Sequence, residues 1–271
     1  SSLEWLPPPA AAGGELAVTG YVVQQKLGAG GAWAEVARAA AGEARAAVAD
    51  VFSHGAGSFP LFRVAALNRA GRGPWSAELV VTGLSTHRFE RAEGDAFDER
   101  GVLFHLGTKG GTQPYANPHG GDSGVVASMS SVDFLSGSDP KRLTEHRHGS
   151  AVFNCTQDKP GQWAAVDLGA SHRLVLDHYA LRHDKQNSYQ LRSWTLEGSN
   201  DAHTWQPLRE HKNDASLADE MAVAAWALDG AAVGGRSFRH FRVRQTGKNA
   251  YGSDSLRCAG IELYGRLATS E

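Results

Sequence analysis

Short apolar stretches bounded by turn-forming residues follow one another along almost the whole chain. Examples are YVVQQK (21–26), FRVAALN (62–68), SWTLEGS (193–199) and RHFRVRQTG (239–247). In the last of these, Phe241 and Val243 alternate with polar residues, as they do in a strand that is buried on one face. Helical periodicity over ten or more residues is absent. Strands of this length between turns are typical of β-sandwiches, so the chain is predicted to be all-β.

One segment, RAAAGEARAAVA (38–49), has the composition of a helix, because Ala, Glu and Arg all favour helix. Strands are predicted on both sides of it, so we expect the local helix propensity to be overridden. Gly28, Gly30 and Gly31 are expected to form a hairpin turn between two strands of this region.

Length and charge limit the classes of function. A chain of 271 residues suggests about two domains. The net charge of −2 gives no overall attraction to nucleic acid. No apolar run approaches the roughly 20 residues of a membrane span.

The two cysteines, Cys155 and Cys258, form no CxxC motif. Their scarcity favours a reducing compartment, and we expect a cytoplasmic protein. The sequon Asn154-Cys155-Thr156 lies in a predicted strand and is expected to be accidental.

The first part of the chain contains LEW (3–5), GYVVQQK (20–26) and FRVAALNRAGRGPWSAELVVTG (62–83). These residues resemble a fibronectin type III domain that covers residues 1–83. The resemblance runs from the second strand of that fold to its last, and the first strand has no counterpart. Pro60 stands where the family has a tyrosine. The resemblance implies a β-sandwich that is part of a larger polypeptide.

Residues 84–95, LSTHRFERAEGD, are polar and of mixed charge, so they are predicted to be a linker. Phe89 is the only aromatic residue in this segment. We expect it to pack between the two domains.

Strand patterns resume after the linker. The predicted strands, besides the two already quoted from this part, are GVLFHLG (101–107), VVASMSS (125–131), AVFNCT (151–156), QWAAVDLG (162–169), RLVLDHYALRH (173–183), TWQPL (204–208), AVAAWAL (222–228) and AGIELYG (259–265). Trp163 and Trp194 are expected to be core residues, because each tryptophan can bury ~150–250 Å².

The segments QWAAVDLG, YALRH, SWTLEGSNDAHTWQPL, FRHFRVRQTG and GIELYG resemble a discoidin domain over residues 96–267. This family is the coagulation-factor C-type branch of the galactose-binding-like jelly rolls. The resemblance implies a β-sandwich whose closing strand pairs back near the start of the domain. GVLFHLGTKGGTQPYANP followed by VVASMSS is similar to the intracellular members found in BTB-domain proteins and ubiquitin-ligase scaffolds.

The glycine-rich run GTKGGTQPYANPHGG (107–121) invites comparison with a phosphate-binding loop. Such a loop ends in Gly-Lys-Ser/Thr and opens directly into a helix. Here Lys109 is followed by Gly110, and Pro114 and Pro118 forbid a helix immediately downstream. We therefore expect a rim loop between early strands and no nucleotide cofactor.

Some histidines and acidic residues are candidates for metal binding or catalysis. His146 and His148 lie on one side of an extended segment, but no third ligand is indicated by spacing. Ser150, His183 and Asp184 lack the surroundings of a nucleophile elbow. We expect no catalytic residue, no metal and no other cofactor.

Sugar binding is the main alternative to protein binding. The fucose-binding branch has a histidine, then Arg-x-Asp, then a basic residue, and Arg182-His183-Asp184 supplies the middle of this pattern. Gln157 and Tyr189 occupy its two ends, so a structural Arg–Asp turn is favoured.

Two other kinds of ligand receive less support. Phe134 and Leu135 are the only apolar residues at a loop tip that could insert into a membrane, and we expect them to end a buried strand. Arg242, Arg244 and Lys248 with Tyr251 nearby could bind nucleic acid, but an Arg-rich strand face is usually only solvated. We expect neither a membrane nor a nucleic-acid partner.

The sequence therefore predicts a non-catalytic recognition or scaffolding module of a larger cytoplasmic protein. Its partner is expected to be a protein, with a glycan as the alternative, bound through loops at one end of the second sandwich. Ubiquitin-ligase recruitment and cytoskeletal scaffolding both fit. The predicted ligand-binding residues are Tyr115, His119, Lys141, Arg142, His146, Arg147, His148, Lys185, Tyr189, Lys248 and Tyr251.

Both cysteines are predicted to be free thiols. Thiol titration of the denatured, unreduced protein should find two reactive groups per chain, because a reducing compartment leaves no driving force for a disulfide. A count of zero would contradict this prediction and favour a secreted lectin.

Overall fold

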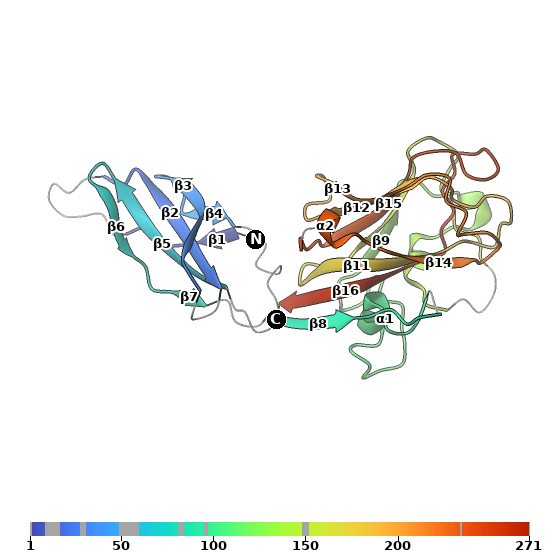
Figure 1. Cartoon of the computed structure of the whole chain (residues 1–271), viewed down its shortest axis with the longest axis horizontal. Coiled ribbons are helices and arrows are strands. Elements are labelled where there is room, and N and C mark those ends of the chain that lie inside the picture. The colour runs from blue at the N-terminus through green and yellow to red at the C-terminus, as the bar shows by residue number, and fades with distance from the viewer. Residues whose placement is uncertain are drawn as a thin grey trace. The chain divides into compact units, whose positions relative to one another are not determined.

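The computed structural model describes residues 2–8, 17–27, 31–48, 60–80, 84–94, 97–147, 152–233 and 235–270. The chain divides into two compact units, one formed by Ser1–Thr86 with Thr269–Glu271 and one formed by His87–Ala268. Both units consist mainly of strands arranged in sandwich-like sheets (Figure 1). The predicted all-β fold class is confirmed.

The described residues of the first unit form strands β1 to β7. They are β1 (Ser2–Glu4), β2 (Gly20–Leu27), β3 (Ala34–Ala40), β4 (Arg45–Ala47), β5 (Pro60–Asn68), β6 (Gly71–Trp75) and β7 (Leu79–Val80). Strands β1 and β4 form a two-stranded antiparallel sheet. The second sheet has the order β3-β2-β5-β6, and β7 also pairs with β5. Tyr21, Val23 and Phe62 are buried in this unit.

The Ala-rich segment 38–49 is not helical where the structure describes it. Strand β3 extends to Ala40, a turn follows, and β4 begins at Arg45. Because β2 and β3 pair along their length, cross-strand hydrogen bonds replace the helix that the local composition favours. The expected hairpin glycines Gly28 and Gly30 lie outside the described residues.

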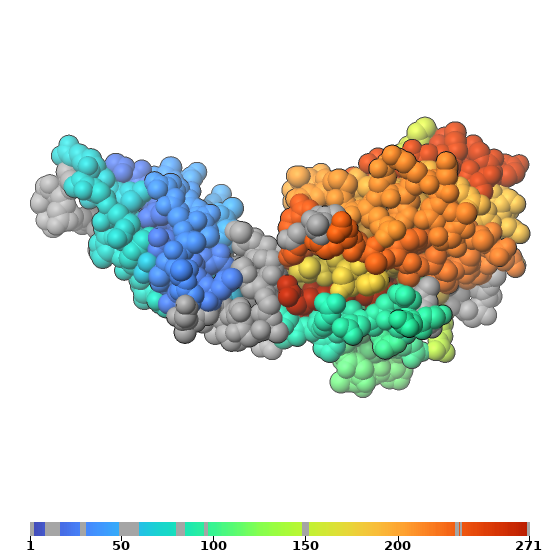
Figure 2. Space-filling view, viewed as in Figure 1, coloured from blue at the N-terminus to red at the C-terminus, as the bar shows by residue number. Residues whose placement is uncertain are grey.

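The second unit is built from two facing antiparallel sheets. Its elements are β8 (Leu84–Phe89), α1 (Val102–Gly107), β9 (Val126–Met129), η2 (Phe134–Ser136), η3 (Pro140–Thr144), β10 (Trp163–Asp167), β11 (His172–Arg182), β12 (Trp194–Ser199), β13 (Gln206–His211), β14 (Val223–Ala227), α2 (Gly230–Val233), β15 (His240–Gln245) and β16 (Gly260–Ser270). One sheet has the order β13-β12-β15-β10-β9 and the other β14-β11-β16-β8. The closing strand β16 thus pairs with β8, the first strand of the sheet, as expected (Figure 1). In the space-filling view, red atoms from the end of the chain lie next to teal atoms of the segment that begins with β8 (Figure 2).

The core of the second unit lies between its two sheets. Phe241 and Val243 of β15 are buried while Arg242 and Arg244 alternate with them on the other face, as the sequence predicts. Trp194 is completely buried, which confirms its assignment to the core.

Trp163 is only partly buried, so its assignment to the core is wrong. It lies opposite Arg244 in the ladder between β10 and β15, on the outward face of the sheet.

Residues 84–89 form strand β8, although they fall in the range predicted to be a linker. Phe89 is buried in the same cluster as Val102, Leu103 and Leu267. Its ring also contacts the rings of His87 and His105, at centroid distances of 4.5 and 4.8 Å. The expectation that Phe89 is an interdomain docking residue is therefore wrong, because its side chain belongs to the core of the second unit.

Residues 102–107 form helix α1 instead of the predicted strand. The buried carboxylate of Glu262 on β16 accepts hydrogen bonds from the backbone N–H groups of Leu103 and Phe104, at 2.8 and 3.1 Å. These bonds satisfy two of the donors that a helix leaves unpaired at its start. Gly101 is required beside them, since a Cβ there would lie 2.1 Å from Cδ of Glu262.

The predicted strand 151–156 is reduced to an isolated bridge between Cys155 and Arg257. Its backbone groups bond partly to side chains and partly to the backbone of other segments. The N–H of Cys155 donates to Oγ of Ser138 at 2.9 Å, and the carbonyl of Asn154 accepts the N–H of Cys258 at 3.0 Å.

Five histidines of the second unit have a pKa below the ordinary value, chiefly because burial disfavours the charged ring: His105, His172, His183, His211 and His240. The unfolded chain takes up protons on these rings below about pH 6.5, and the folded chain does so only at lower pH. Each ring therefore lowers the stability of the fold as the pH falls. Glu262 has the opposite effect, because burial raises the pKa of its carboxyl to about 8, and its contribution is lost as the pH rises towards that value.

Five histidine pKa values are lowered by burial and one carboxyl pKa is raised. We therefore predict that the free energy of unfolding falls between pH 7 and pH 5. Urea denaturation at pH 7, 6 and 5 measures this directly. A free energy that stays constant or rises towards pH 5 would show that the buried rings do not control the acid stability.

A candidate binding surface at one end of the second unit

A connected series of side chains leads from the interior of the second unit to solvent. Asp184 is fully buried and accepts a hydrogen bond from Nη1 of Arg257 at 2.9 Å. The guanidinium of Arg257 lies 4.5 Å from the ring centroid of Tyr189. Tyr189 stacks on Tyr251 with 4.4 Å between centroids and 21° between planes. Tyr251 remains 65% exposed. The series holds a large aromatic ring at the surface in a defined position.

Asn249 organises the loop that presents Tyr251. Its Oδ1 accepts the backbone N–H groups of Tyr251 and Ser253, both at 3.0 Å. Its Nδ2 donates to the carbonyl of Ser255 at 3.0 Å. Because these bonds are already made in the free chain, Tyr251 loses little conformational freedom when a ligand contacts it.

The sequence Arg182-His183-Asp184 is part of the interior. Nη1 of Arg182 donates to the carbonyl of His146 at 2.8 Å, and Asp184 also accepts the backbone N–H groups of Asn154 and Gln186. His183 is fully buried, with Nε2 2.7 Å from the carbonyl of Gln186. None of the three is placed to reach a sugar in solution, which supports the structural interpretation of this turn.

Phe134 and Leu135 lie in η2 and are 81% and 101% exposed. The expectation that they end a buried strand is therefore wrong. The turn that contains them is closed by its own hydrogen bonds: Oδ1 of Asp133 accepts the N–H of Leu135 at 3.1 Å, and Gly137 adopts a left-handed conformation with φ 68°. A strand is replaced here by a one-turn 3-10 helix whose two apolar side chains point to solvent.

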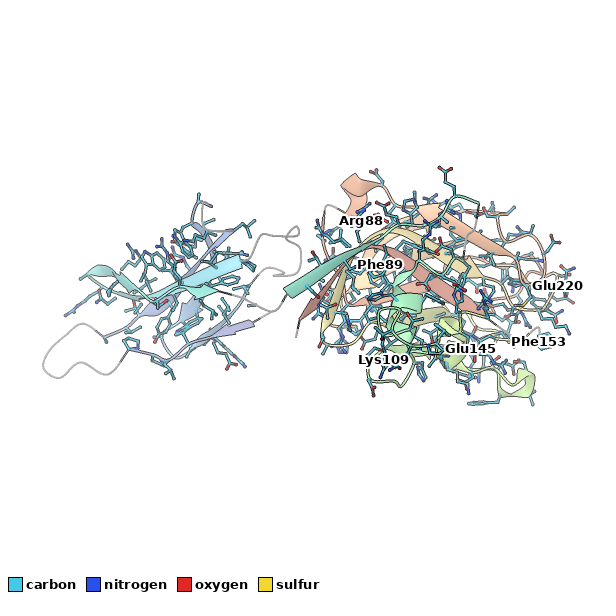
Figure 3. All side chains as sticks on the ribbon, turned by 90° about the horizontal axis from the view of Figure 1, so that it is seen from below. Arg88, Phe89, Lys109, Glu145, Phe153 and Glu220 are labelled. Atoms are coloured by element: carbon cyan, nitrogen blue, oxygen red, sulfur yellow. The ribbon has the colours of Figure 1, made fainter. Side chains whose placement is uncertain are left out.

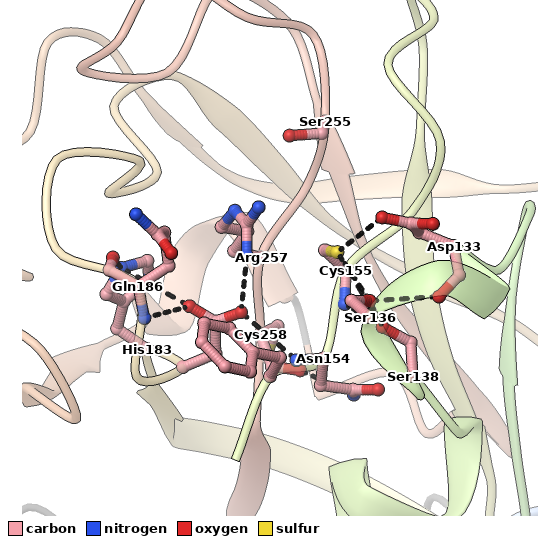
Figure 4. Close-up of polar contacts among 12 residues, drawn as sticks. Asp133, Ser136, Ser138, Asn154, Cys155, His183, Gln186, Ser255, Arg257 and Cys258 are labelled. Atoms are coloured by element: carbon pink, nitrogen blue, oxygen red, sulfur yellow. Dashed lines mark hydrogen bonds and ion pairs between the residues drawn. The ribbon is translucent and has the colours of Figure 1, made fainter. Parts of the chain in front are cut away.

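The turn η2 is connected to the tyrosine pair through the segments of Cys155 and Arg257. The N–H of Asp133 donates to the carbonyl of Cys155 at 3.1 Å, and Cys155 is bridged to Arg257, whose guanidinium contacts Tyr189. Figure 4 shows Cys155 between the segment of Asp133 and the segment of Arg257. We call the surface formed by residues 133–137, 184–189 and 248–255 the loop-end surface.

The predicted ligand-binding residues fall into two neighbouring groups. Lys185, Tyr189, Lys248 and Tyr251 lie on the loop-end surface. Tyr115, His119, Lys141, Arg142, His146 and Arg147 lie around α1 and η3. The two groups meet at Asn154, whose Oδ1 accepts the N–H of Asp139 and whose N–H donates to Asp184, both at 3.0 Å. His148 lies outside the described residues.

Several residues of the second group have structural contacts. The hydroxyl of Tyr115 donates to the carbonyl of Thr144, and burial raises the pKa of Tyr115 above its usual range. His146 is buried, 4.6 Å from the ring of Phe104. Nδ1 of His119 accepts the N–H of Ala127 at 2.9 Å. These side chains shape the loops and offer little exposed surface.

Most of the predicted cations are paired with carboxylates. Lys141 lies 3.4 Å from Asp139, Lys248 lies 2.5 Å from Asp254, and Arg147 pairs with Glu99. Arg242 and Arg244 share Glu197, at 2.5 and 3.0 Å. Lys185 is exposed. The positive charge of the surface is therefore largely neutralised, and aromatic and apolar groups distinguish it.

The glycine-rich run borders a cleft of about 490 Å³ in the second unit. Gly110 and Gly111 form one wall, and residues of β8 and α1 form the others. Lys109 lies near α1 (Figure 3) and pairs with Asp122 at 2.7 Å. The N–H groups of Gly110 and Gly111 donate to His105 and Thr108. These donors are used within the loop and do not form a phosphate cradle.

Both cysteines are buried free thiols, and burial raises the pKa of Cys258 to about 12. Asn154 of the sequon is fully buried and donates through Nδ2 to the carbonyl of Cys258 at 2.7 Å. The folded chain therefore does not present this asparagine for glycosylation.

Among the described residues, no group of three or more His, Cys, Asp or Glu side chains could hold a metal ion. Ser150, considered above as a nucleophile, lies outside the described residues. Over the same described ranges, no helix is long and apolar enough to cross a membrane.

Comparison with curated proteins finds relatives among large multidomain proteins. The chain is 34% identical over 191 residues to the E3 ubiquitin-protein ligase Ufd4 of Drosophila melanogaster, which is 67% of this chain and 6% of the ligase. It is 32% identical over 174 residues to the E3 ubiquitin-protein ligase hecd-1 of Caenorhabditis elegans, covering 63% of this chain and 6% of that protein. It is 31% identical over 173 residues to the BTB/POZ domain-containing protein At2g30600 of Arabidopsis thaliana, covering 62% and 21%. The chain thus spans only a small part of each relative. No protein-family model matches it.

Solved structures similar to this chain include carbohydrate-binding modules. One is CpGH89CBM32-5 from Clostridium perfringens in complex with GalNAc-beta-1,3-galactose, with 14% identity, 52% of this chain and 96% of that chain covered, and a TM-score of 0.41. Another is the lectin domain of lectinolysin complexed with Lewis B antigen, with 17% identity, 52% and 93% coverage, and a TM-score of 0.41. Similarity at this level says nothing about the ligand of this chain.

Proposed function

We propose that this chain is a non-catalytic recognition module of a larger cytoplasmic protein, and that it binds a protein partner through the loop-end surface. In this proposal the first unit is a fibronectin type III domain and the second a discoidin-like jelly roll. The first unit acts as part of the scaffold, and the second supplies the binding surface.

The observation that supports this function best is the connected series from Asp184 through Arg257 and Tyr189 to Tyr251. An exposed tyrosine that is already fixed offers a large contact area at a small entropic cost. Tyrosine and arginine are also the residues that most often dominate the energy of protein interfaces. The paired charges around the series suit the polar rim of such an interface.

The names of the relatives suggest which kind of larger protein contains this module. Two are called E3 ubiquitin-protein ligases and one a BTB/POZ domain-containing protein. Within such a protein, a module without its own chemistry would recruit a substrate or position a neighbouring domain. We propose recruitment to a ubiquitin-ligase scaffold as the role, with cytoskeletal scaffolding as the competing possibility.

A carbohydrate-binding module remains the alternative function. The exposed ring of Tyr251 favours it, since a sugar can stack on an aromatic face. The burial of Arg182 and Asp184 opposes it, because a pyranose needs exposed polar groups beside the ring to fix its hydroxyls.

The Tyr251→Ala variant tests the proposed function. The 271-residue chain and the variant are compared in affinity purification with quantitative mass spectrometry, beside a glycan array. The proposal predicts one or more proteins whose capture falls about tenfold or more in the variant, as expected when a central aromatic anchor is removed.

The His203→Ala variant is the matched control. His203 is exposed in the turn that follows β12, whereas Tyr189 lies before the start of β12, so the two residues are at opposite ends of this strand. It should leave capture unchanged. Glycan binding that disappears with Tyr251→Ala, without any protein partner that does so, would replace the proposed function by the lectin alternative.

A further inference from the structure

Phe134 and Leu135 are the most exposed large apolar residues among those described in the second unit. Phe153 is 36% exposed and immediately precedes Asn154, which bonds to Asp139 after η2. Figure 3 shows Phe153 and Glu220 towards the same end of the second unit. A single exposed apolar residue is ordinary, but two adjacent ones as large and as exposed as Phe134 and Leu135 form an apolar tip.

Hydrogen bonds within the turn and to the buried Cys155 hold the turn that contains Phe134 and Leu135. Oγ of Ser136 donates to the carbonyl of Asp133 at 2.9 Å, and the N–H of Gly137 donates to the carbonyl of Phe134 at 3.1 Å. Ser136 and Ser138 also contact Sγ of the buried Cys155, at 3.3 and 3.6 Å (Figure 4). The exposed side chains therefore project from a rigid base and are not the tip of a loose loop.

The charged residues beside Phe134 and Leu135 favour a protein partner over an anionic membrane. The segment from Asp133 to Asp139 contains two carboxylates and no lysine or arginine. Asp139 pairs with Lys141, whereas Asp133 has no cationic partner among the described residues. Nη1 of Arg142 donates to the carbonyl of Phe153 at 2.5 Å. An anionic membrane attracts cations around an inserted apolar tip, and the tip itself has none.

We propose that Phe134 and Leu135 form an apolar prong that inserts into an apolar pocket with a basic rim on a protein partner. This rests on the proposed function of the loop-end surface and adds a second anchor beside Tyr251. Phe153 would contact the edge of the pocket, and Asp133 would face a lysine or arginine of its rim.

The test begins with a photoreactive benzophenone residue placed at position 135 of the 271-residue chain, and separately at position 251. The protein crosslinked from position 135 is purified and titrated with the wild-type chain and with four variants. Phe134→Ala and Leu135→Ala should each weaken binding about tenfold or more, whereas Leu135→Met should change it less than threefold. Asp133→Asn should weaken binding and reduce its dependence on salt.

Two measurements keep the outcomes distinct. Thermal melting of the Phe134 and Leu135 variants should match the wild type, because both side chains are exposed. Asp133→Asn should also melt near the wild type, because asparagine keeps the Oδ1 that accepts the N–H of Leu135. Sedimentation with vesicles of phosphatidylcholine, with and without phosphatidylserine, tests the membrane. Vesicle binding that Leu135→Ala abolishes would overturn the proposal in favour of a lipid surface.

Crosslinking from position 251 but not from position 135 would overturn the prong and leave the proposed function standing. The same holds for a partner whose affinity falls with Tyr251→Ala but not with Phe134→Ala or Leu135→Ala. Crosslinking from neither position would overturn both.

Discussion

The ion pair between Asp184 and Arg257 is the interaction on which the loop-end surface depends. A fully buried carboxylate is costly unless charge and hydrogen bonds compensate it. Asp184 receives Nη1 of Arg257 and the N–H groups of Asn154 and Gln186. These three donors come from three different segments of the chain. The carboxylate therefore ties together the end of β11, the segment before Cys155 and the segment before β16.

Arg257, one partner of this pair, contacts both the tyrosine pair and the segment at the base of η2. Arg257 lies against Tyr189 and thereby supports Tyr251. Through its bridge with Cys155 it also fixes the segment that receives the N–H of Asp133 at the base of η2. Removing one partner of a buried ion pair typically costs ~3–5 kcal/mol, because the other charge is left uncompensated. The tyrosine pair would then lose the guanidinium that supports it.

The sequence predicts those strands whose apolar and polar residues alternate along the chain. The strand β15 is an example, since the burial of Phe241 and Val243 follows from the pattern alone. It does not predict what depends on a distant side chain. Helix α1 begins where Glu262, 159 residues from Leu103, accepts its N–H groups, and nothing within 101–107 reveals that partner.

The binding surface is only partly predictable for the same reason. Tyr189 and Tyr251 could be named as ligand-binding residues because they are aromatic residues in polar loops, but their stacking on each other and on Arg257 required the fold. Phe134 and Leu135 were expected in a core because apolar residues usually are. The turn residues Asp133 and Gly137 on either side are the signal that would have indicated exposure.

The measurement that tests this account most directly is hydrogen exchange of the Arg257→Met chain. Methionine keeps most of the side-chain volume and removes the charge that Asp184 requires. We predict that the backbone N–H groups of Tyr251 and Ser253 exchange about tenfold or more faster, because the tyrosine pair loses its support, while those of β12 and β15 change much less. Unchanged exchange in residues 248–255 would contradict the claim that the buried ion pair holds the loop-end surface in place.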